Sequence, residues 1–456
     1  MFGLEILKSR LKDAPKTSGV YLFKNKKDIP IYIGKAINIK RRLSNYGNLP
    51  KLPRRLQKMV SQTVNIDFEL TESERNALLL EALLIKKFSP RYNIRLKDDK
   101  SFPLIKITNG AFPRLTRFRN DFSNEDKVFG PFTSALKTDK VIKILQKSFK
   151  LRSCNDSEFK NRTRPCLLYD LKQCSAPCVS KVDENEYKNQ VSDTIKFFQG
   201  SQKKIFNKLE KQMVYFSESQ NYEKAAELRD SIQSLNYITR EEVKISTQET
   251  NFDYIHIDNK KHFSIYIGFI RYGRYLGGNL IYYSDKFEED IDPTSLIIQF
   301  YLKSFRPKKI IISKKIQGYN ELKSIMKENY KIDVSLKSNN IVGIQKISNL
   351  TAKRNDKEVS LQKQKYVNNQ EILNLLKIKF NIKNNVERVE AYDNSFFGNN
   401  YAVASYVVFN EEGFSIKDSR TYKFKDYDLK KFGDADLMRK VFKLSLIHIS
   451  EPTRHT

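Results

Sequence analysis

The sequence is poor in cysteine and has no long apolar run. It contains four cysteines among 456 residues, all between positions 154 and 178, and this clustering excludes a secreted scaffold held together by many disulfides. No run of about 18 apolar residues occurs, so a membrane-spanning helix is not expected. The first 16 residues are charged and amphipathic, unlike a signal peptide. Together these absences predict a cytoplasmic protein.

Negative charge is scarce relative to positive charge. Lysine and arginine number 83 against 53 aspartates and glutamates, which gives a formal net charge of +30. A polyanionic partner such as nucleic acid explains this excess best, because each phosphate that is neutralised releases condensed counterions. The alternative explanation is general solubility in a composition rich in lysine, isoleucine and asparagine.

The length allows about three domains. Alternating β-branched and helical segments predict a multidomain α/β protein, and the polar residues 315–385 are expected to include loose connections. The expected parts are a small α+β domain (1–98), a cysteine-containing linker region (99–200), a helical hairpin (201–240), an α/β domain (250–443) and a tail (444–456).

The first domain begins with two short β-like runs at 19–23 and 29–34, joined by a polar turn. A helix is expected from Asn38, a good N-cap residue. A second helix is expected from Thr71, where Thr71 and Glu74 have the spacing of a capping box, to about residue 90.

Several residues of this domain suit phosphodiester hydrolysis. Arg42 and Tyr46 are four apart and are expected on one side of the first helix. Tyr21 and Tyr32 lie on the two predicted strands, close to Lys35. Hydrolysis needs a base to activate water, a cation to hold the phosphate's growing charge and usually a metal. Because a tyrosine has an ordinary pKa near 10, it acts as a base only where cations favour its phenolate.

Glu81 is the best candidate for a metal ligand. Its helical neighbours three and four positions away are all apolar, whereas a solvated glutamate normally lies on a polar stripe. A carboxylate in this setting suits Mg²⁺, with water completing the shell. The alternative is a glutamate at the edge of the buried stripe that reaches out to Lys86 or solvent.

The ordered motifs GVY, YIGKA, N, RR and Y, followed by LEALLIKKFSPRYN, resemble the GIY-YIG nuclease domain of the bacterial UvrC excision nucleases. The resemblance implies Mg²⁺ or Mn²⁺ as cofactor and Tyr32 as the general base. It places the family's motif tyrosines on Tyr21 and Tyr32, its glycine on Gly34, its active-site lysine and arginine on Lys35 and Arg42, a further tyrosine on Tyr46, the metal-binding glutamate on Glu81 and an asparagine on Asn93.

The cysteines Cys154, Cys166, Cys174 and Cys178 have the spacing C-x11-C-x7-C-x3-C. Four thiolates this close together suit one metal centre, although a common zinc ribbon has two C-x2-C pairs. The set resembles the cysteines that some UvrC proteins carry here, which implies an iron–sulfur cluster. Zinc is one alternative, and free thiols are another.

Two apolar stripes at helical spacing predict an antiparallel helical hairpin over 203–238. Helices this short are marginal alone and need a partner, which is either the rest of the chain or another protein. The string EKAAELRDSIQSL resembles the UVR motif through which UvrC binds UvrB. The resemblance implies a docking surface that includes Met213, Ala225, Leu228, Arg229 and Ile232.

Beyond residue 250, the segments FSIYIGFIRYGRYLGG and VERVEAYDNSFFGNNYAVASYVVF resemble the UvrC C-terminal nuclease domain, which has an RNase H-like fold. The family's first metal-binding aspartate falls on Asp393, but Phe396 stands where the family has a histidine. Asp393 alone does not complete a two-metal site, so the second incision site is expected to be incomplete. The last residues, LSLIHISEPTRHT, break the family pattern and are expected to be non-native from residue 444.

These features predict a metal-dependent endonuclease of nucleotide excision repair. It is expected to cut damaged double-stranded DNA on the 3′ side of a lesion through the GIY-YIG site, in complex with UvrB. A non-catalytic DNA-binding adaptor and a stand-alone GIY-YIG nuclease are the alternatives.

Overall fold

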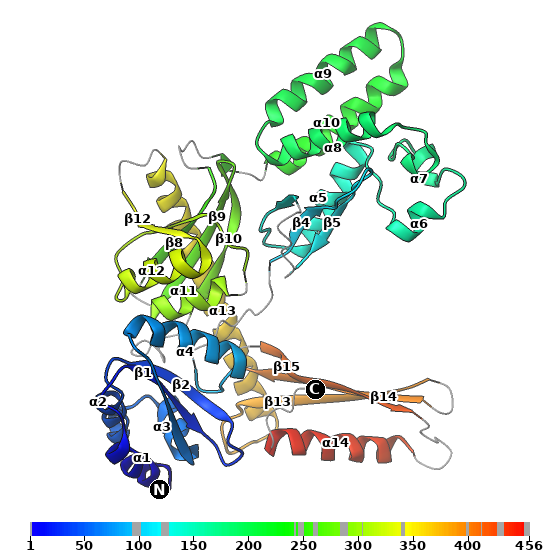
Figure 1. Cartoon of the computed structure of the whole chain (residues 1–456). Coiled ribbons are helices and arrows are strands. Elements are labelled where there is room, and N and C mark those ends of the chain that lie inside the picture. The colour runs from blue at the N-terminus through cyan, green and yellow to red at the C-terminus, as the bar shows by residue number, and fades with distance from the viewer. Residues whose placement is uncertain are drawn as a thin grey trace. The chain divides into compact units, whose positions relative to one another are not determined.

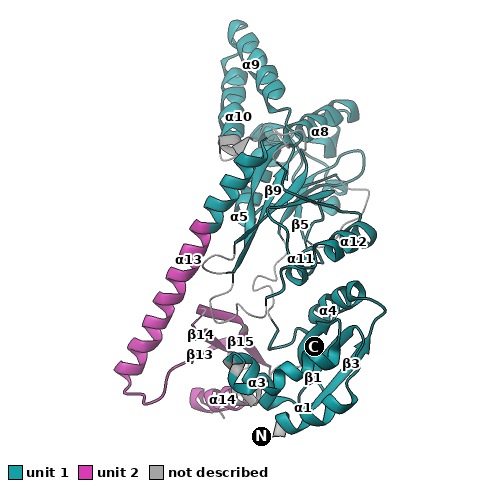
Figure 2. Cartoon of the chain, turned by 90° about the vertical axis from the view of Figure 1, so that its left-hand side faces the viewer, with its two compact units in different colours: residues 1–355 teal, residues 356–456 magenta. Residues whose placement is uncertain are grey.

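The computed structural model forms two compact units, Met1–Asn355 and Asp356–Thr456 (Figure 2). The described residues are 2–93, 102–119, 127–240, 243–244, 250–258, 263–282, 291–302, 304–338, 343–397, 401–411, 413–425 and 433–450. Among them, no helix is both long and apolar enough to cross a membrane.

The N-terminal domain is built on a three-stranded antiparallel sheet of order β2-β1-β3 (Figure 1). The predicted hairpin is confirmed, with Tyr21 opposite Gly34 and Phe23 opposite Tyr32. The strands are β1 (Gly19–Lys24), β2 (Pro30–Ala36) and β3 (Asn65–Leu70). The helices are α1 (Phe2–Asp13), α2 (Ile39–Ser44), α3 (Arg54–Gln62) and α4 (Glu74–Phe88), with 3-10 turns at Asn45–Gly47 and Leu49–Lys51.

The helix starts show where local sequence signals hold and where they fail. Asn38 caps α2 as predicted, because its side chain accepts a hydrogen bond from the Arg41 amide at 2.9 Å. The predicted capping box at Thr71 is wrong. Ser73 is the N-cap of α4 and accepts from the Asn76 amide at 3.2 Å, while the Thr71 amide donates to the Ser18 carbonyl.

The middle part of the chain has a small sheet of order β5-β4-β6, with helices packed against it. Its elements are β4 (Leu104–Ile107), β5 (Leu115–Phe118), β6 (Lys127–Phe129), α5 (Ala135–Ser148), α6 (Asp156–Lys160), α7 (Leu167–Asp170), a 3-10 turn at Pro177–Val179 and α8 (Glu184–Phe198). The predicted helical hairpin follows as α9 (Gln202–Glu218) and α10 (Tyr222–Arg240).

A six-stranded mixed sheet of order β12-β11-β8-β9-β10-β7 completes the first unit. Strands β8, β9 and β10 are antiparallel, and β11 and β12 continue the sheet in parallel with β8. The strands are β7 (Val243–Lys244), β8 (Phe252–Asp258), β9 (Ser264–Arg271), β10 (Arg274–Tyr282), β11 (Lys309–Ile312) and β12 (Asp333–Leu336), and the helices are α11 (Pro293–Tyr301) and α12 (Tyr319–Tyr330).

The second unit contains an antiparallel sheet of order β13-β14-β15. Leu437 and Val441 of the last helix pack on the buried side chains of β14. The elements are β13 (Arg388–Phe397), β14 (Tyr401–Asn410), β15 (Gly413–Lys425) and α14 (Asp434–Ser450). The polar segment 315–385, expected to include loose connections, contains α12, β12 and the long helix α13 (Ile344–Lys379) among its described residues.

Helix α4 joins the N-terminal domain to the six-stranded sheet. Leu78 and Ala82 on α4 belong to the same buried cluster as Leu296 and Phe300 on α11. Lys86 also donates a hydrogen bond to the Leu302 carbonyl at 3.2 Å. Helix α11 therefore packs against the helix that carries Glu81.

Candidate active site

Three buried tyrosines share one hydrogen-bonded cluster beneath the N-terminal sheet. The Tyr46 hydroxyl lies 2.9 Å from the Tyr21 hydroxyl and donates to the Tyr32 hydroxyl at 3.2 Å. All three side chains are at least nine-tenths buried. Tyr46 was expected to continue the helix of Arg42, but α2 ends at Ser44 and Tyr46 lies in the 3-10 turn that follows. This turn still brings the Tyr46 ring close to Arg42.

Arg42 supplies a cation at the edge of this cluster. Its Nε donates to the Tyr21 hydroxyl at 3.4 Å, and its guanidinium lies 5.8 Å from the centre of the Tyr46 ring. Burial raises the pKa of Tyr21, although the charge of Arg42 opposes the shift. Burial also raises the pKa of Tyr46 well above its ordinary value. The charges that Tyr21 and Tyr46 would carry raise the pKa of Arg42 further, so the guanidinium stays charged.

Gly34 allows the close approach that this cluster needs. A Cβ atom at position 34 would overlap the phenol group of Tyr21, which lies across the β1–β2 hairpin. The glycine of the YIG motif is therefore explained by side-chain packing.

Glu81 lies on α4 with its carboxylate directed into the site. It is 8% exposed, and its Oε1 accepts a hydrogen bond from the Lys35 amide at 3.1 Å. Among the described residues, Oε2 has no hydrogen-bond partner. Burial, reinforced by the charge of Asp292, raises the pKa of Glu81 to about 7, against the opposing effects of Lys35 and Ser295. A buried carboxylate oxygen without a partner is suited to bind a hard cation.

Lys35 is paired with a residue that sequence reasoning missed. Its Nζ lies 3.1 Å from Oδ2 of Asp292, the N-cap residue of α11. Burial lowers the pKa of Lys35, but the charges of Asp292 and Glu81 outweigh it and the net shift is upward. The sequence Asp292-Pro293 signals a helix start, but no local signal connects it to a lysine in β2.

Asn93 holds strand β2 in place. Its Oδ1 accepts from the Ile33 amide at 2.8 Å, and its Nδ2 donates to the Ile33 carbonyl at 2.6 Å. Both backbone groups of Ile33 that face away from β1 are therefore satisfied. Asn93 fixes the strand between Tyr32 and Gly34.

The four cysteines lie in the middle part of the chain, apart from this cluster. None forms a disulfide, and Cys174 is buried. Burial raises the pKa of Cys174, and the charges of Cys166, Cys154 and Cys178 act in the same direction, so the thiols are within electrostatic reach of one another. No three His, Cys, Asp or Glu side chains in the described part of the chain are arranged as a preformed metal site.

Contacts of Arg152 and Lys172 hold the segment that carries these cysteines against the rest of the middle part and the hairpin. Arg152 is 5% exposed and donates to the Phe112 carbonyl and the Asp156 carboxylate, each at 2.6 Å. Lys172 lies 2.9 Å from the Glu227 carboxylate on α10. The cysteine segment thus contacts the helical hairpin directly.

The hairpin uses part of its predicted docking surface internally. Leu228 and Ile232 pack against the core of the middle part, and Met213 and Ala225 are half-buried, whereas Arg229 is exposed. The exposed apolar side chains are Val214, Tyr215 and Tyr222, near the hairpin's turn. Sequence reasoning missed these three residues because helical spacing does not say which stripe faces its own protein.

Asp393 lies on β13 in the second unit and is exposed. The neighbouring Asn394 faces the opposite side, where its Nδ2 donates to the Asp434 carboxylate at 2.9 Å. Consecutive strand residues point to opposite faces, so Asp434 does not share the face of Asp393. Asp434 therefore does not supply a second carboxylate beside Asp393.

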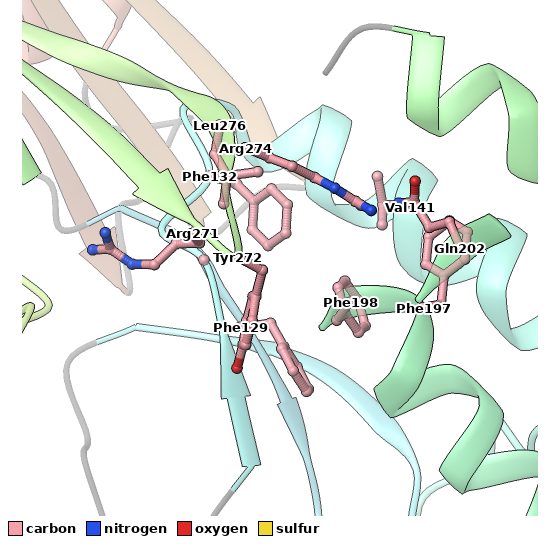
Figure 3. A pocket seen from close by; sticks show the side chains of 11 residues that line it. Phe129, Phe132, Val141, Phe197, Phe198, Gln202, Arg271, Tyr272, Arg274 and Leu276 are labelled. Atoms are coloured by element: carbon pink, nitrogen blue, oxygen red, sulfur yellow. The ribbon is translucent and has the colours of Figure 1, made fainter. Parts of the chain in front are cut away.

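A separate small cavity of about 30 Å³ lies where β6, α8 and the β9–β10 turn meet. Aromatic side chains gather around it, among them Phe129, Phe198 and Tyr272, and Arg274 extends along one side (Figure 3). The described residues that line it include no acid, histidine or cysteine. The described lining therefore offers no carboxylate, imidazole or thiolate to bind a metal.

Comparison with known proteins connects these features to one family. Family models match residues 17–94 (UvrC-like GIY-YIG domain), 102–197 (UvrC/Cho excinuclease, middle domain), 203–238 (UvrB/uvrC motif) and 377–451 (UvrC RNAse H endonuclease domain). The UvrABC system protein C of Rickettsia bellii (strain RML369-C) is 37% identical over 440 residues, which cover 93% of this chain and 68% of the relative. The chain belongs to the UvrC family.

Other relatives agree with this assignment. The UvrABC system protein C of Rickettsia felis (strain ATCC VR-1525 / URRWXCal2) is 38% identical, over 92% of this chain and 66% of the relative. The chain thus spans about two thirds of the length of these UvrC proteins. Residues 252–336, which hold most of the six-stranded sheet, lie outside all four family-model matches.

A solved structure from Thermotoga maritima is similar to the first domain. It is the GIY-YIG N-terminal endonuclease domain of UvrC, bound to its catalytic divalent cation, magnesium. It is 39% identical, covers 19% of this chain and 96% of its own, and has a TM-score of 0.18. The GIY-YIG residues named above lie within residues 17–94, which the UvrC-like GIY-YIG family model matches.

Proposed function

We propose that this UvrC-family chain is the endonuclease subunit of nucleotide excision repair, cutting one strand of damaged double-stranded DNA on the 3′ side of the lesion while bound to UvrB. One observation carries the proposal. The buried carboxylate of Glu81, with an unpartnered Oε2, hydrogen-bonds to the backbone of Lys35 in the strand that also carries Tyr32.

The proposed cofactor at this site is Mg²⁺ or Mn²⁺, held by Glu81 with water and phosphate oxygens. When bound, it supplies charge that stabilises the phosphate in the transition state. Tyr32 takes the proton from the attacking water, as one bond to phosphorus forms and the bond to the leaving oxygen breaks. The Tyr46 hydroxyl donates to Tyr32 and so favours its phenolate.

The cations of the site stabilise the charge that develops on the phosphate. Arg42 stays charged over the whole working range of pH, and its guanidinium lies at the edge of the tyrosine cluster. Lys35 is held near Glu81, and releasing it from Asp292 would let it face a phosphate oxygen.

A strand-nicking assay tests the proposal with a duplex that carries one bulky lesion, in the presence of UvrB and Mg²⁺. Glu81→Gln should abolish the nick, because it removes the charge that holds the metal. Glu69→Gln changes an exposed glutamate of β3 in the same domain and should leave the nick unchanged. A metal-independent nick, or one that survives Glu81→Gln, would contradict the proposal.

Two other functions remain as alternatives. A non-catalytic DNA-binding adaptor would bind the duplex without nicking it under any metal. A stand-alone GIY-YIG nuclease would nick equally with and without UvrB, and its incision would not depend on the α9–α10 hairpin.

The proposed UvrB-binding surface is the α9–α10 hairpin. Its members are the predicted Met213, Ala225, Leu228, Arg229 and Ile232, and the exposed Val214, Tyr215 and Tyr222 extend it. Tyr215→Ser with Tyr222→Ser should weaken UvrB binding without unfolding the chain, since both side chains are about two-thirds exposed. The matched control is Tyr401→Ser, a tyrosine of similar exposure on β14.

The four cysteines are proposed to hold an iron–sulfur cluster, with zinc as the alternative. Their confinement to one segment and their electrostatic proximity support this reading. Anaerobic purification should give visible charge-transfer absorption for a cluster and none for zinc, while metal analysis finds the ion in each case. Titration of four free thiols without bound metal would contradict both.

The proposal also includes the domain limits, cytoplasmic location and non-native status of residues 444–456 given by the sequence. For the tail, the family-model match runs to residue 451, which overlaps the first half of that segment. Sequencing the genomic DNA beyond codon 443 decides this point.

A further inference from the structure

Helix α5 presents lysines on the side that faces away from its core. Its buried residues are Thr138, Ile142 and Leu145. Lys140, Lys143 and Lys147 are all exposed, and at 100° per residue they fall within one narrow arc on the opposite side of the helix. The arc runs about 10 Å along the helix axis.

The lysines of this arc are not neutralised by acids of their own helix. Asp139 is the acidic residue of α5, and it lies 3.1 Å from Arg117 on β5. Among the described residues, the side chains of Lys143 and Lys147 have neither an ion pair nor a hydrogen bond. Like charges three and four positions apart destabilise a helix, so a bound anion would stabilise this arrangement.

Two other helices of the same chain, α8 and α12, carry exposed charges of both signs. On α8, Lys188 pairs with Glu184 at 2.6 Å, one turn away. On α12, Lys323 and Lys327 are also exposed and four apart, but Glu321 and Glu328 lie on the same helix. A merely solvated helix face has charges of both signs. The face of α5 has one sign.

We propose that the exposed face of α5, formed by Lys140, Lys143 and Lys147, binds the phosphate backbone of the DNA duplex. The fit is one of charge complementarity, because lysines that neutralise phosphates release the counterions condensed on the duplex. The inference rests on the proposed function for its choice of DNA. It assigns to the middle part of the chain a positioning contact separate from the nuclease site.

The salt dependence of DNA binding tests this surface in the full chain. The variant Lys143→Gln with Lys147→Gln removes two charges without introducing new ones. If both lysines contact phosphate, the slope of log affinity against log salt should become shallower by about 1.8, since each contact contributes about 0.9. Phosphate contacts carry no sequence information, so the change should be equal for an undamaged duplex and for one with a lesion.

The matched control is Lys323→Gln with Lys327→Gln on α12, which removes the same charge at the same spacing. It should leave the slope unchanged, and both variants should keep the wild-type far-ultraviolet circular dichroism. An unchanged slope in the α5 variant, or an equal change in the α12 variant, would overturn the proposal. Failure of the proposed function is distinguishable, because a wild-type chain that never nicks would still show the α5 effect on binding.

Discussion

Nζ of Lys35 lies 3.1 Å from Oδ2 of Asp292 and thereby connects strand β2 of the GIY-YIG domain to the first turn of α11. Both side chains are partly buried, at 21% and 31% exposure, which makes the pair less screened than a surface ion pair. The same aspartate acts on Glu81, whose pKa it raises in addition to the larger effect of burial. One residue outside the GIY-YIG motifs therefore influences two residues within them.

Asp292→Asn should lower the pKa values of both Glu81 and Lys35. The amide keeps its ability to cap α11, where Asp292 Oδ1 accepts from the Thr294 amide at 2.9 Å, so mainly the charge is lost. The pKa of Glu81 and the pKa of Lys35 should both fall, because the charge of Asp292 raises each. Manganese binding at pH 6, followed by isothermal titration calorimetry, should become weaker, because the charge of Asp292 attracts a divalent cation at Glu81 more strongly than it attracts a single proton.

Asp333→Asn is the control for this variant, since Asp333 is exposed at the start of β12. It should leave manganese binding unchanged. Equal binding by the wild type and the Asp292→Asn variant would show that the Asp292 charge does not reach Glu81.

Metal binding should depend on pH through Glu81. Because burial and Asp292 raise its pKa to about 7 from the ordinary 4.5, a proton competes with the metal below neutrality. The apparent affinity for Mn²⁺ should fall about tenfold per pH unit below pH 7 and level off above it. The stability of the metal-free protein should depend on pH in the opposite direction. Because the pKa of Glu81 is higher in the folded protein, its protonation stabilises the fold at low pH, and this contribution to the free energy of unfolding is lost as the pH rises from 4.5 to 7. A metal affinity independent of pH between 5 and 7 would contradict this account.

Gly34→Ala should disable the site by displacing a side chain. The new Cβ would overlap the Tyr21 phenol, which is buried and has no room to move without disturbing Tyr46. Incision should fall by at least tenfold, with a loss of stability of about 1–3 kcal/mol from overpacking. Gly47→Ala is the control, because no atom lies within 4 Å of a Cβ at that position. Nicking rates and thermal unfolding of both variants check the prediction.

Tyr46→Phe should affect stability and activity together. Its hydroxyl lies 2.9 Å from the Tyr21 hydroxyl and 3.2 Å from the Tyr32 hydroxyl in a buried cluster. Removing it takes one hydrogen-bond partner away from each of these two buried hydroxyls. The expected loss is about 1–3 kcal/mol of unfolding free energy, with a slower incision rate. Tyr215→Phe removes an exposed hydroxyl and should change neither. Urea unfolding curves would measure the difference in unfolding free energy between each variant and the wild type, provided that the dependence on urea concentration has the same slope in both.

The sequence alone identified the residues of the tyrosine cluster, and the reason is local. Residues 19–36 form a hairpin with a short turn, so their pairing follows from a short stretch of chain, and Asn38 is a cap in direct sequence contact with its helix. The burial of Glu81 could be predicted from its apolar neighbours on the same helix, because they place it on the buried face of α4 whatever that face packs against.

The features that escaped prediction depend on residues far apart in the sequence or on a choice between near-equal local signals. Asp292 reaches Lys35 only because α11 packs on α4, and no pattern near either residue encodes that packing. Thr71 and Ser73 are both acceptable caps, and the Thr71 amide is already used by Ser18. Helix α13 is polar on most of its surface, so composition favoured a loose segment where helix propensity produced 36 helical residues.

The tyrosine cluster has a direction, which follows from counting its hydrogens. A phenol carries a single hydrogen, and Tyr46 uses its own toward Tyr32, so the bond between Tyr46 and Tyr21 must be donated by Tyr21. Tyr21 in turn accepts from the Arg42 guanidinium. The donors therefore run in one sense from a permanent cation through two phenols to Tyr32, and polarisation accumulates along such a chain. The last oxygen of this chain belongs to Tyr32, so two phenols connect the guanidinium to the tyrosine that we propose as the general base.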